Sequence, residues 1–503
     1  MKILSTITFA VLSLFLFFSF FACDDDDDND DSVDDDSSDD DTSDDDSSDD
    51  DTGDDDDTTD DDTSDDDDTG PDDMYVSVNG DDANPGTQSE PKQTITAGVG
   101  LVATGGTVHV AAGTYAESVS VSGVSLLGGY EDGGWTRDIA ANQTSIEGLV
   151  DQPALTITGA STKEVIEVSG FSIQGNGSTA SAYGVKILDG ANATFSDNIV
   201  TAIQNEISRQ KDSPVEASYG VFLTDSTVVF TRNELNGNNG APTSFLSYAL
   251  RGERSTVEIT DNVIYGGSAG GGYAWGVYLL DDSAGSIINN DIDGGIASSQ
   301  YNATAVFVYE NQPMIITGNA IYGGEGASSN GLVLESSYVT VINNMIDGGN
   351  GTEGSTGLYI HQRCCSASVV NNSIFGGNNN RTRAVSDRQL VNSNDEDVFL
   401  VNNILHAGTG DPDSMVIFLT YQDNGDYSKE ILINNDFYDP DGDCLVMDHD
   451  VCLDDIADVN ACEFEGCVEA SGNISAQPQW VSADDFHLTA GSLCIDAGID
   501  PAP

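Results

Sequence analysis

Five basic side chains lie close together late in a chain that has few of them. The set consists of His361, Arg363, Arg381, Arg383 and Arg388. Only 15 of the 503 residues are Lys or Arg, so this concentration is unusual. A base beside carboxylates suits proton abstraction, and Glu335 and Asp387 supply carboxylates in the same region. The alternative is salt bridging to acidic surroundings, and no catalytic motif decides between the two.

Four aspartates near the end of the chain are spaced in the manner of a calcium loop. They are Asp436, Asp439, Asp441 and Asp443. Carboxylates at such intervals offer the hard oxygen ligands that calcium prefers. The glycine of this stretch comes one place early for an EF-hand, and Asp450 replaces the glutamate that ends such a loop. Two interpretations stay open, a structural calcium ion and an acidic turn closed by a disulfide.

Eight cysteines add a second possible chemistry. They are Cys23, Cys364, Cys365, Cys444, Cys452, Cys462, Cys467 and Cys494. Short separations favour the disulfides Cys444–Cys452 and Cys462–Cys467, which form readily outside the cytoplasm. A zinc site is the alternative, although no CxxC spacing supports it. Modification of Cys23 would leave an odd number of cysteines, so at least one is then unpaired or bonded to another chain.

A repeat from Gly184 to about Asn435 positions these candidates. Its inner asparagines are Asn198, Asn233, Asn262, Asn290, Asn319, Asn344, Asn372, Asn403 and Asn435. Their spacings of 25–35 residues indicate stacked coils. Each repeat contains three apolar, β-prone runs separated by Gly, Asn, Asp or Ser. This pattern predicts an all-β fold, a right-handed single-stranded parallel β-helix with regular coils over residues 184–440.

The recurring asparagines have a structural interpretation and a functional one. Asn tolerates the left-handed backbone conformation and bonds to nearby backbone, as a corner between strands requires. Stacked asparagines can also form a hydrogen-bonded ladder along the axis, and the Gly-Gly pairs that follow supply positive-φ positions. The functional alternative is a row that binds a ligand.

Two further sets of residues depend on the register of the coils. An acidic column on one edge consists of Asp189, Asp225, Asp281 and Glu310. These residues either hold a cation between like charges or are exposed turn residues. The aromatic residues of the middle coils either stack on sugar rings or fill corners. They are Tyr265, Tyr273, Trp275, Tyr278, Tyr301, Tyr309, Tyr322, Tyr338 and Tyr359.

The chain begins with a targeting segment over residues 1–23. Lys2 supplies the positive start, and a long Phe- and Leu-rich run follows. The segment ends in SFFAC, which resembles a bacterial lipobox and implies lipidation of Cys23. A single membrane-spanning anchor is the alternative. Both place the mature chain outside the cytoplasm, and we expect a lipid-anchored protein of the outer membrane that is exposed at the cell surface.

Residues 24–73 form an acidic, low-complexity linker. They include 32 Asp and no basic residue. Like charges repel and almost no apolar residues are available for a core, so we expect a disordered stalk. The remaining chain still has 55 acidic and 14 basic residues. This excess of negative charge argues against nucleic acid and anionic lipid as partners. It also argues against a strongly anionic polysaccharide, unless calcium bridges the two.

Both ends of the folded part, residues 74–503, resemble a known class of protein. Tyr75–Tyr130 contains YVSVNGDDANPGT and GGTVHVAAGTYAE, and it is similar to the N-terminal cap of bacterial β-helix proteins of the pectin-lyase-like superfamily. That cap, expected here at residues 74–130 with a short helix in Thr94–Thr104, also opens a family of unknown function. Pro478–Gly498 resembles the closing segment of such proteins, within a Cys-containing C-terminal cap at residues 441–503.

The resemblance specifies an architecture and leaves two functions open. Polysaccharide lyases with this fold use an Arg or Lys base beside calcium-binding carboxylates, but no catalytic residue is carried over because no motif matches. We expect a monomeric, non-catalytic glycan-binding or adhesion protein. The alternative is a polysaccharide lyase, epimerase or hydrolase, with calcium as the only cofactor considered.

Overall fold

The computed structural model describes residues 70–160, 164–204, 217–238, 245–362, 366–389, 397–409, 413–420, 429–440, 444–482, 485–495 and 497–498. Predictions for Cys23, the signal peptide, nearly all of the linker, Arg363, Cys364, Cys365, Asp441 and Asp443 fall outside these residues. In the described part of the chain, no helix is long and apolar enough to cross a membrane.

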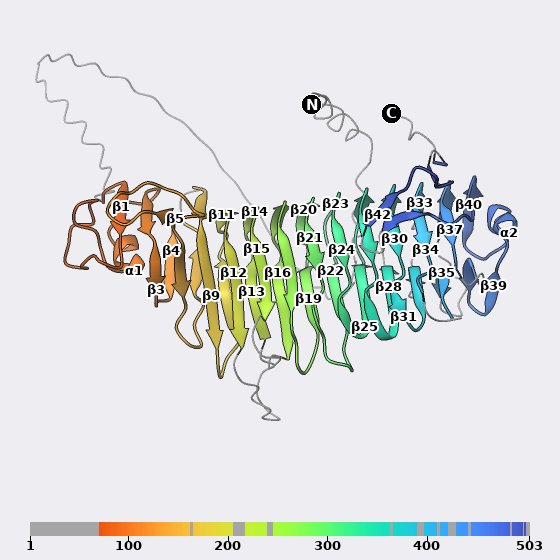
Figure 1. Cartoon of the computed structure of the whole chain (residues 1–503), viewed down its shortest axis with the longest axis horizontal. Helices are drawn as coiled ribbons and strands as arrows, with labels where there is room; N and C mark the ends of the chain where they lie inside the picture. The colour runs from red at the N-terminus through yellow and green to blue at the C-terminus, as the bar shows by residue number, and fades with distance from the viewer. Residues whose placement is uncertain are drawn as a thin grey trace, which may run out of the picture. The chain divides into compact units, whose positions relative to one another are not determined.

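Three long sheets wind around one interior (Figure 1). In order, the strands of sheet A are β1 (Asp73–Val76), β2 (Thr107–Ala111), β5 (Ser125–Tyr130), β8 (Ile166–Ser169), β11 (Asn192–Ser196), β14 (Thr227–Thr231), β17 (Thr256–Thr260), β20 (Ala284–Ile288), β23 (Met314–Thr317), β26 (Val339–Ile342), β29 (Ala367–Val370), β33 (Asp397–Val401), β36 (Lys429–Ile433) and β40 (Cys467–Ser471).

Sheet B follows sheet A in each coil. Its strands are β3 (Gly113–Tyr115), β6 (Thr144–Glu147), β9 (Phe171–Gly177), β12 (Ile199–Gln204), β15 (Glu234–Asn238), β18 (Val263–Gly267), β21 (Asp291–Asp293), β24 (Ala320–Tyr322), β27 (Met345–Asp347), β30 (Ser373–Phe375), β34 (Ile404–His406) and β37 (Asp436–Tyr438).

Sheet C precedes sheet A in each coil. Its strands are β4 (Val119–Ser122), β7 (Leu155–Thr158), β10 (Ala182–Leu188), β13 (Ala217–Thr224), β16 (Leu246–Glu253), β19 (Ala274–Leu280), β22 (Ala303–Tyr309), β25 (Glu325–Glu335), β28 (Asn350–Gln362), β32 (Thr382–Gln389), β35 (Met415–Thr420), β38 (Val446–Asp448) and β39 (Val451–Leu453), and β31 (Asn378–Asn379) also pairs with β28.

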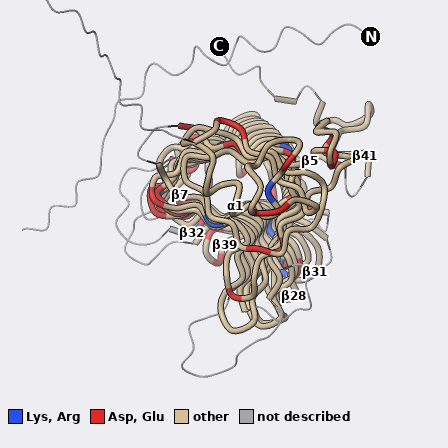
Figure 2. The backbone as a smooth tube through the Cα atoms, turned by 90° about the vertical axis from the view of Figure 1, so that its left-hand side faces the viewer, with Lys and Arg blue, Asp and Glu red and all other residues tan. Residues whose placement is uncertain are grey.

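Neighbouring coils pair in parallel and in register, which confirms the predicted right-handed parallel β-helix. Val185, Val221 and Leu250, for example, occupy equivalent positions in three successive strands of sheet C. Viewed end-on, the coils superpose around one closed cross-section (Figure 2). Their inward side chains form a continuous apolar core, because alternate residues of each strand point to opposite faces.

The inner asparagines form the ladder that the repeat predicted. All nine are at most 2% exposed, and each amide donates to the side-chain oxygen of the asparagine in the next coil at 2.9–3.2 Å. The ladder extends one step further than predicted, to Asn473. The left-handed backbone expected at these asparagines was wrong, because it lies one residue earlier, as at Asn289 and Asn343.

The two glycines of each Gly-Gly pair are required for different reasons. Gly295 has a φ of +81°, which side chains rarely tolerate. Gly294 has ordinary backbone, but a Cβ there would collide with the carbonyl oxygen of Gly323 in the next coil. The same two requirements recur in the following coils, so both glycines of the motif are needed for neighbouring coils to approach.

Both ends of the described coils are covered. At the start, α1 (Ile95–Val99) is shorter than the predicted helix, and Glu117 accepts hydrogen bonds from its first amides. At the other end are α2 (Ile456–Asn460) and the antiparallel pair β38–β39. A hairpin of β41 (Trp480–Ser482) and β42 (Asp485–Leu488) contacts sheet B, where the Trp480 ring stacks on His406 at 5.0 Å.

Candidate functional site

The outer face of sheet C brings together most of the residues that could do chemistry. Its outward positions form three columns, because equivalent residues of successive strands lie one above another. Strands β10–β22 contribute mainly aromatic residues to this face, and we call them the aromatic half. Strands β25–β35 contribute the charged half. Sheet strands hold these side chains about 4.8 Å apart from coil to coil.

The aromatic half is a stack of rings. Tyr183, Tyr219, Tyr248 and Trp275 lie in equivalent positions of four successive coils, with centroids 4.9, 5.1 and 4.5 Å apart and planes within 8° of parallel. In the next column Tyr278 stacks on Phe307 at 4.8 Å. Because the rings face one another, their faces are occupied by protein.

Arg251 belongs to this aromatic half. Its guanidinium lies 5.5 Å from the centre of the Tyr248 ring and 5.7 Å from that of Tyr278, and it pairs with Glu253 at 2.6 Å. Tyr219 and Tyr248 are 8% and 4% exposed. Burial raises the pKa of both phenols. These contacts make the aromatic half a second, smaller core on the outside of the sheet.

This outcome corrects our interpretation of the aromatic residues, which do not form a single cluster. Trp275, Tyr278, Tyr309 and Tyr359 point outward from sheet C, whereas Tyr265 and Tyr322 belong to sheet B. The stack also includes residues that the sequence analysis overlooked. A signal was available, since an aromatic residue precedes the Gly-Val or Ala-Leu of several repeats in YGVK, YGVF, YALR and WGVY.

The charged half contains a histidine held by a carboxylate. His361 Nδ1 lies 3.1 Å from Glu335 Oε1, and the side chains are 15% and 19% exposed. Tyr359 lies beside the histidine, two residues earlier on the same strand. His361 Nε2 is buried and has no hydrogen-bond partner among the described residues. A carboxylate on one imidazole nitrogen fixes the orientation of the ring, and the other nitrogen lies just beneath the surface.

One arginine lies beside this pair, and two more lie further along the same face, about 16 Å or more away along the strand. Arg388 occupies the position equivalent to His361 in the next coil, and Arg383 is equivalent to Thr356. Arg381 lies in the preceding turn, with a φ of +48°. None of the three forms an ion pair with a described residue. Burial and the charge of Arg381 lower the pKa of Arg383.

The structure places the predicted bases in two pairs on the same face, His361 beside Arg388 and Arg381 near Arg383, separated by about five positions along the strand, and Arg363 lies outside the described residues. Glu335 was correctly grouped with them. Asp387 was not, because it is 1% exposed and occupies an inward position equivalent to Ile360 and Leu419. Alternation along β32 explains the error, since Arg388 points out and its neighbour must point in.

The described half of the predicted calcium set is engaged in bonds to backbone. Asp436 accepts from the Ala476 amide and from the Cys494 thiol, and Asp439 accepts from the Cys444 amide. Burial raises the pKa of Asp436 to about 6. No group of three or more His, Cys, Asp or Glu in the described part of the chain could hold a metal ion. Calcium therefore stays a prediction.

The acidic column is a column of turn residues. Asp189, Asp225, Asp281 and Glu310 all have positive φ, as expected directly after a strand where the chain turns. Arg254 takes the same place in the intervening coil and pairs with Asp225 at 2.8 Å. This arginine interrupts the column, so the like charges are not continuous.

The cysteine pairs and the remaining thiol are clearly placed. Cys444 is joined to Cys452 and Cys462 to Cys467, which are the two pairs that the short separations favoured. Cys494 is a free thiol and donates to Asp436 Oδ2 at 2.9 Å. The first disulfide closes the hairpin β38–β39 at the end of sheet C, next to the charged half.

Comparisons with known proteins agree on the architecture. Residues 142–344 match the family described as "Periplasmic copper-binding protein (NosD)", which is less than half of the chain. The match is consistent with a location in the cell envelope. No curated protein matches.

Solved structures with similarity include pectate lyase Pel9A (TM-score 0.38, 13% identity, 85% of this chain and 91% of that chain). The periplasmic alginate epimerase AlgG (0.39, 12%, 74% and 76%) and a rhamnogalacturonan lyase (0.30, 12%, 82% and 90%) are also similar. At these values the likenesses assign no activity to this chain.

Copper binding does not carry over from the family description. The matched stretch contains neither His nor Cys, and imidazole, thiolate and thioether groups are the side chains that copper prefers. Its one methionine, Met314, is 1% exposed and part of the core.

Proposed function

We propose that this protein is a lipid-anchored protein of the cell envelope that binds extracellular polysaccharide, without turning it over, on the charged half of sheet C. The face is long and regular, so it suits an extended chain of repeated sugar units. The face carries both neutral and charged hydrogen-bonding groups. A small number of well-placed polar groups is what gives a binding surface its specificity.

One observation carries the proposal. His361 Nε2 and Arg383 Nε are both buried and without a hydrogen-bond partner among the described residues, and they lie on neighbouring strands of the same face. Buried polar groups normally form hydrogen bonds, and a buried group left without one lowers stability by about 1–3 kcal/mol. Hydroxyl and carboxyl groups of a sugar chain would satisfy both once neighbouring side chains move aside to expose these nitrogens.

Titration calorimetry with a panel of neutral and acidic oligosaccharides tests the proposal. The full chain is expected to bind at least one of them, and His361→Ala is expected to weaken that binding while the free energy of unfolding changes little. Each titration is repeated with calcium and with a chelator, because calcium is the one cofactor that the sequence suggested. Absence of binding to every member of the panel, in both conditions, contradicts the proposal.

Glu335 and His361 favour a second candidate, an enzyme that acts on polysaccharide. A histidine oriented by a carboxylate is a common general base, and proton abstraction beside a carboxyl group leads either to elimination or to epimerisation. An elimination produces an unsaturated sugar that absorbs in the ultraviolet. We would conclude that the protein is an enzyme and not a binding protein if that absorbance rises with pectate or alginate and the rise is lost in both Glu335→Gln and His361→Ala.

Anchoring is tested separately from binding. We propose that Cys23 carries the lipid and that the acidic segment after it holds the coils away from the membrane. Cys23→Ser is expected to abolish incorporation of labelled palmitate and to release the chain from the membrane fraction. Protease added to whole cells distinguishes exposure at the surface from the inner face of the envelope. Unchanged labelling of the variant would contradict the anchor.

A further inference from the structure

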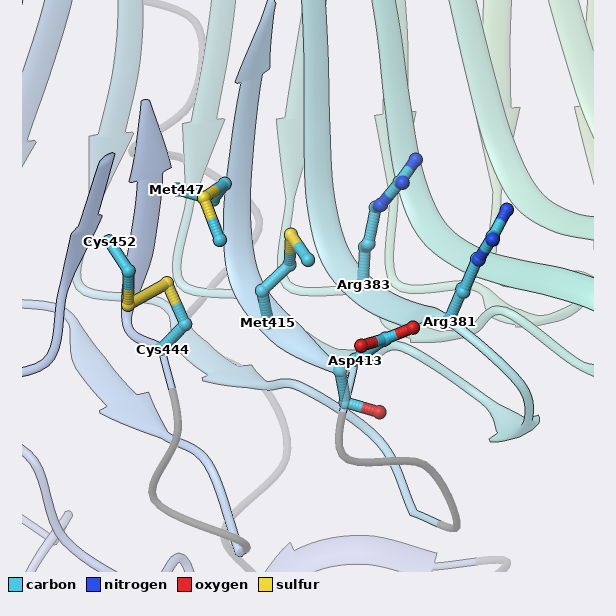
Figure 3. A pocket seen from close by; sticks show the side chains of 8 residues that line it. Arg381, Arg383, Asp413, Met415, Cys444, Met447 and Cys452 are labelled. Carbon is cyan, nitrogen blue, oxygen red and sulfur yellow. A yellow bond between two sulfur atoms is a disulfide. The ribbon is translucent and has the colours of Figure 1, made fainter. Parts of the chain in front are cut away.

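A pocket of about 280 Å³ lies at the last coils of sheet C. Arg381 and Arg383 form one side of it, and their side chains extend next to each other (Figure 3). The opposite side is formed by Met447 and by the disulfide Cys444–Cys452. The pocket therefore lies between the charged half and the hairpin that closes the sheet.

The two arginines, like Arg388, differ from three other arginines of the described coils. Arg232 and Arg254 each make two hydrogen bonds to one aspartate, and Arg251 pairs with Glu253. Arg381 and Arg383 have no such partner in the described part of the chain, although the whole chain has a net charge of −72. Asp413 also lines the pocket, so two positive groups face one negative group there.

Arg383 is held in one orientation. Its guanidinium lies 3.9 Å from the centre of the Phe418 ring, and its Nε is buried without a hydrogen-bond partner. A guanidinium fixed against an aromatic ring presents its N–H groups in one direction. Its like-charged neighbour Arg381 adds an unfavourable interaction that a bound anion would relieve.

We propose that this pocket is the subsite for an acidic group of the bound glycan, a carboxylate or a sulfate on a sugar ring. This inference rests on the proposed function and names the class of sugar. Arginines bind both oxyanions through paired hydrogen bonds. Met415, Met447 and the disulfide supply an apolar wall, and such a wall suits the C–H faces of the ring that bears the anion.

Three oligosaccharides of equal length test the subsite: oligogalacturonate, its carboxyl-reduced neutral counterpart and a sulfated oligosaccharide. Calorimetry with the full chain is expected to show binding of at least one acidic ligand, at least tenfold tighter than that of the neutral one. Arg383→Gln is expected to remove that preference. Arg254→Gln is the matched control, because it makes the same charge change at an arginine already paired with Asp225.

The outcomes separate the subsite from the proposed function. Equal binding of the neutral and acidic ligands overturns the subsite and leaves glycan binding standing. Binding of none of the three, together with an empty wider panel, overturns both. Equal losses in Arg383→Gln and Arg254→Gln attribute the preference to overall charge and also overturn the subsite. Arg381→Gln, at an exposed turn position, gives the same test if Arg383→Gln fails to fold.

Discussion

The two halves of the outer face of sheet C carry similar numbers of functional groups and use them differently. In the aromatic half, ring faces contact ring faces and Arg251 pairs with Glu253. In the charged half, Arg383 and His361 each retain a buried nitrogen without a partner among the described residues. Both halves are built on parallel strands of the same sheet with the same spacing, so the backbone does not cause the difference.

The comparison shows which kind of evidence separates structure from function on a repetitive fold. Aromatic residues on a β-helix face suggest sugar binding by composition alone, but in this protein they interact mainly with each other. Polar groups whose hydrogen-bonding capacity the protein leaves unused are more informative, because burial without a partner is unfavourable. His361 and Arg383 of the charged half meet that criterion. In the aromatic half Arg251 Nε also lacks a hydrogen-bond partner among the described residues, but its guanidinium is paired with Glu253.

Replacement of Tyr248 by Ala tests the comparison through the largest expected effect. The side chain is 4% exposed and lies between the rings of Tyr219 and Trp275. Loss of a buried aromatic ring costs about 3 kcal/mol or more, so urea unfolding should show a drop of that size while glycan affinity is unchanged. A variant of normal stability that no longer binds glycan would place the binding site in the aromatic half.

Removal of the disulfide tests what stabilises the charged half. The pair Cys444→Ser and Cys452→Ser opens the hairpin that ends sheet C, and disulfides typically contribute about 2–4 kcal/mol. Hydrogen exchange should therefore rise in β35, β38 and β39 and stay unchanged in β13–β19. A uniform rise along all the coils would show that the two halves unfold as one unit.

The sequence was sufficient for the fold because the repeat specifies it several times over. Each coil contains an inner asparagine and three short apolar runs, and five of the coils also have a Gly-Gly pair, so an error in one coil is corrected by the others. The spacing of the asparagines therefore predicted the ladder from Asn198 to Asn435 directly. The corner conformation was misplaced by one residue because sequence alone does not distinguish a residue that needs left-handed backbone from the neighbour whose side chain bonds across coils.

The site was predicted only in part. The concentration of basic residues found His361, Arg381, Arg383 and Arg388, since cations are rare in this chain. Whether each side chain points outward depends on its place in the alternation along the strand. The prediction for Asp387 was wrong because its position points inward. The ring stack was missed because stacking joins residues about 30 positions apart, and only exact register shows that they meet.

Replacement of Tyr359 by Leu tests the charged half with a smaller change. Tyr359 is half-buried beside His361 and belongs to no continuous ring stack. Leu keeps most of the apolar volume, so unfolding should change by less than about 1.5 kcal/mol. A tenfold loss of glycan affinity is expected because the ring and its hydroxyl lie at the centre of the proposed site. An unchanged affinity with the same variant would move the site away from β28.

Unfolding at alkaline pH tests the aromatic half through the smallest and most specific expected effect. Burial raises the pKa of Tyr183, Tyr219, Tyr248 and Tyr278, whereas unfolded tyrosines ionise near pH 10. Below about pH 10 both states keep the protons, so the stabilisation is fully present. Above about pH 10 the unfolded chain releases protons that the folded stack retains, and stability falls with a slope of about 1.4 kcal/mol per pH unit for each such tyrosine.

Tyr248→Phe removes one of these ionisations and keeps the ring in the stack. Urea unfolding from pH 8 to pH 11 should therefore show nearly equal stability for both proteins at pH 8 and a shallower decline for the variant above pH 10. Tyr265→Phe is a control from sheet B, where the phenol is less buried than Tyr248. Equal slopes for Tyr248→Phe and the unmodified protein would mean that Tyr248 ionises freely in the folded state, and the stack would then be open to solvent and to sugars.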